Sequence, residues 1–232
     1  MMEQQSQFSD HNKQEYPAMQ TTKPNAALKD LLEKVPTTAE ILLYKQQNIN
    51  INTQWIYWSI DMLQAGYETE NLIILAGEDI HCNPFEFKSL TNKVFEELHL
   101  DSITPNQIFI IYSMYIIKQA LQSPNKESIS KVLFKLEQLC IENNYNSTLY
   151  EFYLRSNAVG ELEDLDAQWY WNDTSLTKEN WCEYALNYLE QWMNNPIQEN
   201  LSKRQNLSVK VITSNPPKKN IFRKLISFIC KK

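Results

Sequence analysis

The chain has 232 residues, enough for one well-filled domain with flanking segments. Hydrophobic residues make up 43% of it and aromatic residues 12%, which excludes a chain that is disordered throughout. Its formal net charge is −6, and only three glycines occur. Because tight hairpin turns need residues with positive φ, so few glycines argue against an all-β or Rossmann-type chain and predict an all-α protein.

The charge is divided unevenly along the chain. Residues 1–202 hold all 28 acidic residues and 13 of the 22 basic ones, whereas residues 203–232 hold nine basic residues and no acidic one. An acidic body disfavours nucleic-acid binding there, because phosphate contacts require cations. The asymmetry favours a basic protein partner, or a contact between the basic tail and the acidic body.

The cysteines and the apolar runs indicate the compartment. Cys82, Cys140, Cys182 and Cys230 are widely spaced and form no C-x-x-C pair, so we expect buried thiols in a reducing compartment, not a disulfide framework or a zinc site. The first residues lack an apolar signal segment. The longest apolar run, residues 108–117, is about half of the ~20 residues that a membrane span needs. We therefore expect a cytoplasmic protein.

The predicted elements begin after a polar segment, residues 1–24, which is expected to be disordered. Thr37 and Glu40 in TTAE predict a capping box at a helix start. A second helix runs from residue 53 until Gly66 stops it, and Thr69 is expected to cap the next one. One face of the second helix carries a set of large core residues: Trp55, Trp58, Ser59 and Met62.

Two helix starts of similar chemistry follow, NPFE at 83–86 and TPNQ at 104–107, each with proline at the first helical position. Residues 108–117 are apolar on all sides, which predicts a central helix enclosed by the others. The clearest helical pattern comes next, with apolar residues at i, i+3, i+4, i+7, i+10 and i+11: Ile129, Val132, Leu133, Leu136, Leu139 and Cys140.

The last part of the body predicts two further helices. The first, after residue 147, is expected to end at Gly160, and residues 161–176 are expected to form a loop. A final core helix runs over residues 178–193. Residues 25–195 should therefore form a single domain of seven or eight antiparallel helices, arranged as an irregular bundle or a short α-solenoid.

Two clusters of ionisable residues are candidates for catalytic or metal sites. GEDIHCN brings together Glu78, Asp79, His81 and Cys82, and EELHLD brings together acidic residues around His99. Neighbours at i and i+1 diverge on a helix, and neither spacing matches a known motif for metal binding or nucleophilic catalysis. We therefore expect a protein without catalytic activity, cofactor or metal.

The helix predicted from residue 53 begins a sequence pattern that resembles a known group of proteins. The pattern W-x-x-W-x-x-x-M-L-x-x-G-Y-x-T-x-x-L-x-x-L-A-G, from Trp55 to Gly77, precedes NPFE and E-E-L-x-L. Together with the later N-Y-N-S-x-L-Y-x-F-Y and Q-W-Y-W-N-D segments, it resembles small α-helical proteins encoded beside bacterial polymorphic toxins. Those proteins are taken to be immunity proteins. The resemblance covers about residues 40–193 and implies a stoichiometric inhibitor of a cognate toxin, without assigning any functional residue.

The segment ELEDLDAQWYWND, residues 161–173, is the strongest candidate for a partner-binding face. Acidic residues would steer a basic toxin and complement its cationic site, and aromatic rings are common anchors of interfaces. Alternatively, the rings close the end of the bundle and the acids form its solvated rim. The candidate partner-binding residues are Glu161, Glu163, Asp164, Asp166, Trp169, Trp171 and Asp173.

The C-terminal region supports a second hypothesis. Residues 196–217 read as a basic polar linker, and residues 218–232 as a short basic amphipathic helix. Each basic residue near an anionic bilayer contributes roughly 1 kcal/mol of binding free energy. The protein would then be a membrane-peripheral scaffold or regulatory adaptor at the inner face of the membrane. The candidate membrane-contact residues are Phe222, Arg223, Lys224, Leu225, Phe228, Lys231 and Lys232.

Overall fold

The computed structural model describes residues 24–49, 53–79, 81–171 and 175–194. Within these ranges the chain forms nine α-helices and no strand, which confirms the prediction of an all-α fold. The expected N-terminal segment, basic linker and C-terminal amphipathic helix lie outside the described residues. The helices are α1 (Pro24–Lys34), α2 (Thr38–Gln46), α3 (Thr53–Gln64), α4 (Glu70–Ala76), α5 (Pro84–Glu97), α6 (Pro105–Gln122), α7 (Lys126–Glu142), α8 (Tyr150–Leu165) and α9 (Trp181–Met193).

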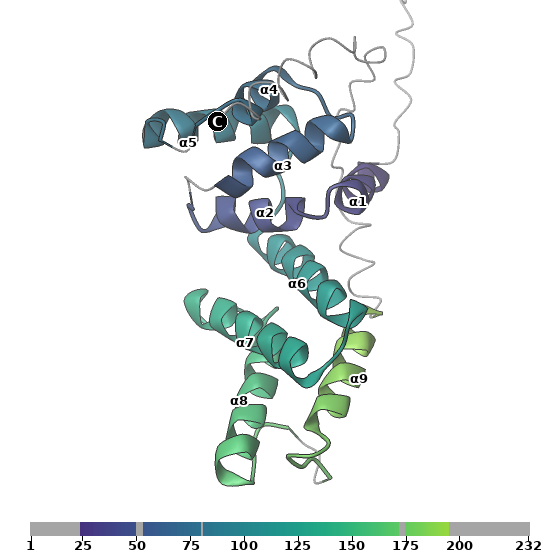
Figure 1. Ribbon diagram of the computed structural model, residues 1–232. Helices are drawn as coiled ribbons and strands as arrows, with labels where there is room; N and C mark the ends of the chain where they lie inside the picture. The colour runs from purple at the N-terminus through teal and green to yellow at the C-terminus, as the bar shows by residue number, and fades with distance from the viewer. Residues whose placement is uncertain (1–23, 50–52, 80, 172–174, 195–232) are drawn as a thin grey trace, which may run out of the picture.

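The helices form two groups joined by α6 (Figure 1). Helices α1 to α5 lie at one end of the molecule and α7 to α9 at the other, and α6 packs against α2 in the first group and against α7 and α9 in the second. Most packing joins helices that are consecutive in the chain, and α7 with α8 is the most extensive pair. One continuous apolar core runs through both groups.

Helix α6 is less enclosed than its composition predicts. Its buried apolar residues lie on one face, where Ile108, Phe109, Ile116 and Ile117 recur at helical spacing. Ile110, Ile111 and other residues between them remain half-buried. The prediction of an all-round core position is wrong because α6 spans the junction between the two groups and is covered only where it meets α2, α7 and α9.

The predicted helix starts have different outcomes. Thr69 caps α4, because its hydroxyl accepts from Leu72 N at 3.4 Å, and Asn83 caps α5 by accepting from Phe85 N at 2.9 Å. The capping box at Thr37 is wrong. Thr37 has helical φ and ψ, and its buried hydroxyl makes no hydrogen bond.

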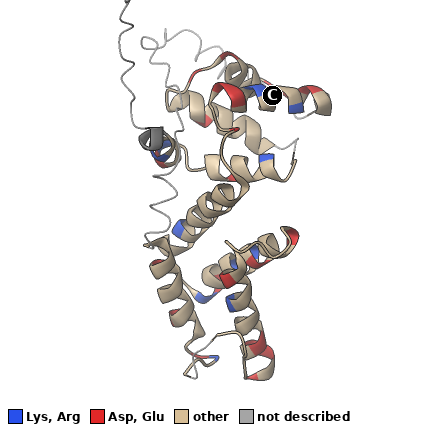
Figure 2. Cartoon of the chain, turned by 180° about the vertical axis from the view of Figure 1, so that it is seen from behind, with Lys and Arg blue, Asp and Glu red and all other residues tan. Residues whose placement is uncertain are grey.

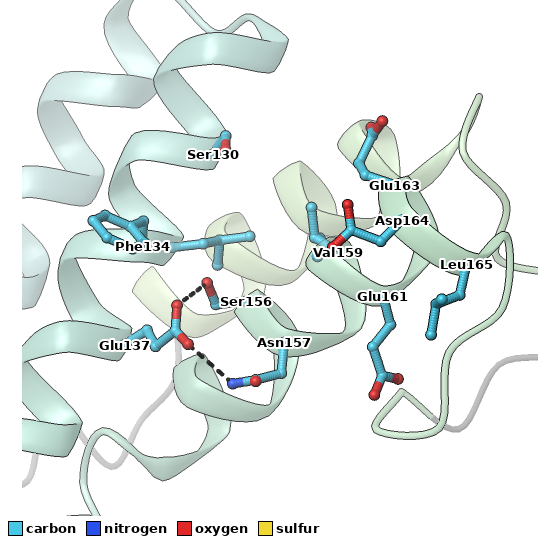
Figure 3. Close-up of a pocket in the computed structure, with 12 residues that line it drawn as sticks. Ser130, Phe134, Glu137, Ser156, Asn157, Val159, Glu161, Glu163, Asp164 and Leu165 are labelled. Atoms are coloured by element: carbon cyan, nitrogen blue, oxygen red, sulfur yellow. Dashed lines mark hydrogen bonds between the residues drawn. The ribbon is translucent and has the colours of Figure 1, made fainter.

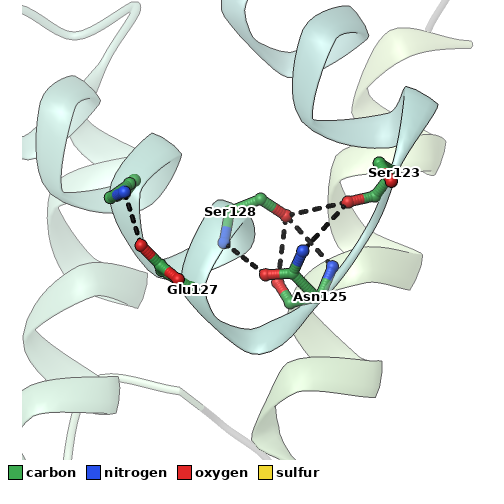
Figure 4. Close-up of polar contacts among 5 residues, drawn as sticks. Ser123, Asn125, Glu127 and Ser128 are labelled. Atoms are coloured by element: carbon green, nitrogen blue, oxygen red, sulfur yellow. Dashed lines mark hydrogen bonds and ion pairs between the residues drawn. The ribbon is translucent and has the colours of Figure 1, made fainter.

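An unpredicted cap starts α7 (Figure 4). The Asn125 side chain accepts from Ser128 N at 2.9 Å, and the Ser128 hydroxyl accepts from Asn125 N at 3.0 Å. This reciprocal pair satisfies two backbone amides that the first turn leaves free. In the same turn, Lys131 Nζ lies 2.6 Å from a carboxylate oxygen of Glu127. The cap therefore fixes where α7 begins.

The first group is held by the predicted aromatic face of α3. Trp55, Trp58 and Met62 are each 1% exposed or less, and the two indole rings meet edge to face at 6.2 Å. The buried Trp58 indole N–H donates to the Thr38 hydroxyl at 2.9 Å, which joins α3 to α2. Phe95 of α5 lies 5.8 Å from the Trp55 ring and completes the cluster.

Helix α8 does not end at Gly160, contrary to the sequence prediction. It continues to Leu165 and ends at Asp166, whose φ of 60° is left-handed. Glycine inside a helix costs about 1 kcal/mol relative to alanine. Burial of Val159 and Leu162 on either side of Gly160 outweighs that cost. Residues 161–165 of the predicted loop are therefore helical.

Two matched valine substitutions distinguish the roles of adjacent threonines. Thr38→Val should lower the free energy of unfolding by about 1–3 kcal/mol, because the buried Trp58 N–H loses its acceptor. Thr37→Val should raise it by about 1 kcal/mol, because it removes a buried hydroxyl without a partner. Urea denaturation followed by circular dichroism measures both. If Thr37→Val lowered the free energy of unfolding by a similar amount, the Thr37 hydroxyl would cap the helix after all, contrary to the structure.

Candidate functional site

A groove of about 500 Å³ lies between α7 and α8 (Figure 3). Its inner wall is apolar, because Leu133 of α7 and Val159 of α8 are buried there. Two large apolar side chains remain exposed at its edges: Phe134 is 57% exposed and Leu165 is 68% exposed. The groove therefore combines a preformed concave shape with apolar surface that the described part of the chain leaves uncovered.

The groove is also acidic. Four carboxylates line it, and its lining includes no lysine or arginine: Glu137 of α7, and Glu161, Glu163 and Asp164 of α8. Figure 2 shows the acidic residues gathered at the C-terminal end of α8. The C-terminal end of a helix already carries a partial negative charge, so these carboxylates strengthen a negative field at this place.

Glu137 holds the two walls of the groove together. Its carboxylate accepts from the Ser156 hydroxyl at 2.7 Å and from the Asn157 amide at 3.1 Å, as Figure 3 shows. Asn157 also donates to the Tyr153 carbonyl at 2.8 Å within α8. These contacts fix the register of α8 on α7, so Glu137 is a structural member of the site.

Glu163 likewise has a structural role. Its carboxylate lies 2.6 Å from Lys126 Nζ at the start of α7 and accepts from the indole N–H of the buried Trp181 at 2.9 Å. The hydrogen bond from Lys126, and then the one from Trp181, lower the pKa of Glu163 below its ordinary value. Glu163 therefore joins the first turns of α7 and α9 to the end of α8.

The remaining predicted acidic residues differ in whether their carboxylates already have partners within the protein. Glu161 accepts from Trp169 N at 3.2 Å, and Asp166 lies 3.8 Å from Lys178. Asp164 is exposed and forms no hydrogen bond or ion pair with its side chain in the described part of the chain. Asp173 lies outside the described residues. Asp164 is thus the predicted acid that is most available to a ligand.

The two candidate tryptophans differ in burial. Trp171 packs inward, with the Arg155 guanidinium 5.0 Å from its ring centre and Tyr184 and Tyr188 edge-on at 6.4 Å. Gln168 fixes it by accepting from Trp171 N and donating to Trp171 O, both at 2.6 Å. Trp169 is 77% exposed. Trp171 closes the core, whereas Trp169 belongs to the surface beside the groove.

Sequence reasoning missed the α7 wall of the groove. Phe134 and Glu137 were not among the candidate residues, although a signal for Phe134 was present. Phe134 falls outside the apolar stripe of α7, whose six predicted members are all buried. An aromatic residue off the core stripe of a clearly amphipathic helix indicates exposed apolar surface.

The other ionisable clusters do not converge on a site. Asp79 accepts from His81 N at 2.9 Å in a local turn, and His99 has a φ of 55° just after the end of α5. Glu97 accepts from Asn71 N and so joins α5 to α4. Within the described ranges, no three His, Cys, Asp or Glu side chains are grouped to hold a metal ion. No described helix combines the length and the hydropathy that crossing a bilayer requires.

A second, smaller hollow of about 380 Å³ surrounds Lys45 of α2. The Lys45 amine donates to the Thr91 hydroxyl at 3.2 Å and lies 5.2 Å over the Phe95 ring. Burial is the main cause that lowers the pKa of Lys45 to about 8. These contacts join α2 to α5, so the lysine has a structural role within the first group.

No known protein family, curated protein or solved structure matches this chain. The groove is therefore the main basis for inferring function.

Alanine substitutions of Glu163 and of Asp164 should affect the melting temperature differently, because only Glu163 has a structural role. Glu163→Ala should lower the melting temperature, because Lys126 and Trp181 lose their shared partner, whereas Asp164→Ala should leave it unchanged. A lowered folded-state pKa stabilises the fold above pH 4.5, and this contribution is lost as the pH falls through the folded-state pKa. The gap between the wild type and Glu163→Ala should therefore narrow below pH 4.5. Equal melting temperatures for the two variants at pH 7 would contradict this assignment.

Proposed function

We propose that this is a non-catalytic interaction protein whose α7–α8 groove binds a basic, amphipathic segment of a partner protein. The observation that carries the proposal is the coincidence, in one groove, of uncovered apolar side chains with four carboxylates, of which only Glu163 forms an ion pair in the described part of the chain. An apolar groove with an acidic rim is complementary to a segment that has apolar residues on one face and Lys or Arg at its edges.

The apolar edges supply binding energy. Phe134 of α7 and Leu165 of α8 both line the groove, so an apolar side chain bound there can cover part of either one. Removing apolar surface from water contributes roughly 25 cal/mol per Å², and aromatic residues dominate the hot spots of protein interfaces. Trp169, beyond the end of α8, is a further exposed aromatic residue.

The acidic residues supply attraction and orientation. Asp164 can pair with an incoming Lys or Arg without losing a partner in the described part of the chain. Glu137 and Glu163 keep their present contacts and add to the negative field of the groove. Such a field increases the association rate of a basic partner and makes that rate fall with added salt.

Gly160 adds an independent argument from stability. It lines the groove, and a methyl group added there would meet nothing within 4 Å. Packing therefore does not require glycine at this helical position, although glycine costs stability there. A bare backbone does allow the main chain of a bound segment to approach α8 closely.

Within this proposal, the most suitable biological role is that of an immunity protein that binds and neutralises a cognate toxin. A toxin that acts on nucleic acid carries a cationic site, and an acidic groove complements such a site. Inhibition of this kind is stoichiometric and requires no catalytic residue. The resemblance of residues 40–193 to immunity proteins favours the same role.

Binding should depend on the groove and not on equivalent residues elsewhere. The protein is co-expressed with the product of the neighbouring gene, and growth, complex formation and the dissociation constant are measured. Asp164→Lys should weaken the complex about tenfold or more at low salt, and Phe134→Ala about 30-fold. Asp61→Lys and Tyr57→Ala on α3 are matched controls, since Tyr57 is 58% exposed, and both should bind normally.

Substitutions of Gly160 by side chains of different size provide a second test of whether the partner binds in the groove. Gly160→Ala should raise the free energy of unfolding by about 0.5–1 kcal/mol and change binding little. Gly160→Leu should keep the fold but block the groove and weaken the complex strongly. Failure to obtain any complex, or normal binding by Asp164→Lys, Phe134→Ala and Gly160→Leu together, would overturn the proposed function.

A further inference from the structure

We propose that the chain carries its own ligand for the groove: residues 218–232 dock between α7 and α8 and compete with the partner. This inference deepens the proposed function and rests on its premise that the groove accepts a basic, amphipathic segment. It adds regulation, because an occupied groove must be vacated before a partner can bind.

The chemistry of residues 218–232 matches the groove. The segment holds six Lys and Arg residues, no acidic residue and apolar side chains at helical spacing, among them Phe222, Leu225 and Ile229. The groove presents the opposite charge beside exposed apolar edges. The described body and this segment are therefore complementary in both charge and apolar surface.

The chain can reach the groove. Helix α9 ends at Met193, and 24 residues separate it from Lys218. A chain of that length spans up to about 80 Å, whereas α9 itself is about 20 Å long. Helix α9 also packs directly on α7, which forms one wall of the groove. A tethered ligand of this kind acts at an effective concentration of order millimolar, so even a weak contact keeps much of the groove occupied.

If residues 218–232 occupy the groove, a partner must bind tightly enough to displace them. The apparent dissociation constant of a partner equals its intrinsic value divided by the fraction of molecules whose groove is open. The contact is largely electrostatic, so added salt should open the groove. A toxin with a stronger basic site would displace the segment, whereas weakly basic proteins would not.

The test uses the full chain and its native Cys230 as a probe. Cys82 and Cys182, which are partly exposed, are replaced by alanine, and buried Cys140 is kept. Ser130→Cys places a thiol on the α7 rim of the groove, and Asp61→Cys on α3 is the matched control. Oxidised glutathione is added to dilute protein, and disulfide formation with Cys230 is followed by mass spectrometry.

Crosslinking within one molecule should be at least tenfold faster for Ser130→Cys than for Asp61→Cys. It should slow severalfold in 1 M salt, with Asp164→Lys or with Gly160→Leu, while circular dichroism shows that each variant is folded. Equal rates at the two positions would overturn the inference. So would a crosslink that forms only between molecules, which would indicate a second copy in the groove.

A vesicle experiment separates the membrane hypothesis from this one. The full chain is sedimented with vesicles of phosphatidylcholine and phosphatidylserine, before and after Phe222→Asp and Lys224→Glu. Binding that these changes abolish, combined with no Ser130 crosslink in the absence of vesicles, would overturn the inference in favour of a membrane contact. A crosslink without any partner complex would instead support the inference and reject only the proposed function.

Discussion

The hydrogen bonds of the Glu137 carboxylate to Ser156 and Asn157 are the contact on which the candidate site depends. They set the register of α8 on α7, and this register brings Gly160, Asp164 and Leu165 of α8 into one groove with Phe134 of α7. Apolar packing alone would allow α8 to slide or rotate, because the hydrophobic effect is not directional. A half-buried carboxylate with two donors is directional, so the groove has one defined shape.

The end of α8 is defined by a second carboxylate. Glu163 joins α8 to the first turns of α7 and α9 through Lys126 and Trp181, and so it fixes the helix that carries the acidic face. The reciprocal cap of Asn125 and Ser128 fixes the start of α7 beside it. Charge in this region therefore has two uses. The carboxylates of Glu137 and Glu163 hold the helices of the groove in place, whereas the carboxylate of Asp164, near the end of α8, is exposed to a ligand.

Regular apolar patterns could be predicted from the sequence because they depend on spacing alone. The six-residue stripe of α7 and the aromatic face of α3 are buried as their periodicity indicates. The contacts that depend on tertiary packing could not be predicted. Thr37 fits a capping motif, but its backbone is already helical, and Gly160 is a helix breaker that packing on α7 overrides. The inward turn of Trp171 required Arg155, Tyr184 and Tyr188 to meet beneath it, and no sequence spacing brings these residues together.

The groove lowers the stability of the free body in three separate ways. Gly160 weakens the helix, Phe134 and Leu165 leave apolar surface in water, and the exposed carboxylate of Asp164 lies at the end of α8 that carries a partial negative charge. Each effect alone is common on protein surfaces. Their coincidence at one place is explained if the groove is normally filled, because a basic amphipathic segment would offset this negative charge and cover the apolar edges at once. Either a basic segment of a partner or residues 218–232 would have this effect, and the second of these matches the concentration of acids in the body and bases in the tail.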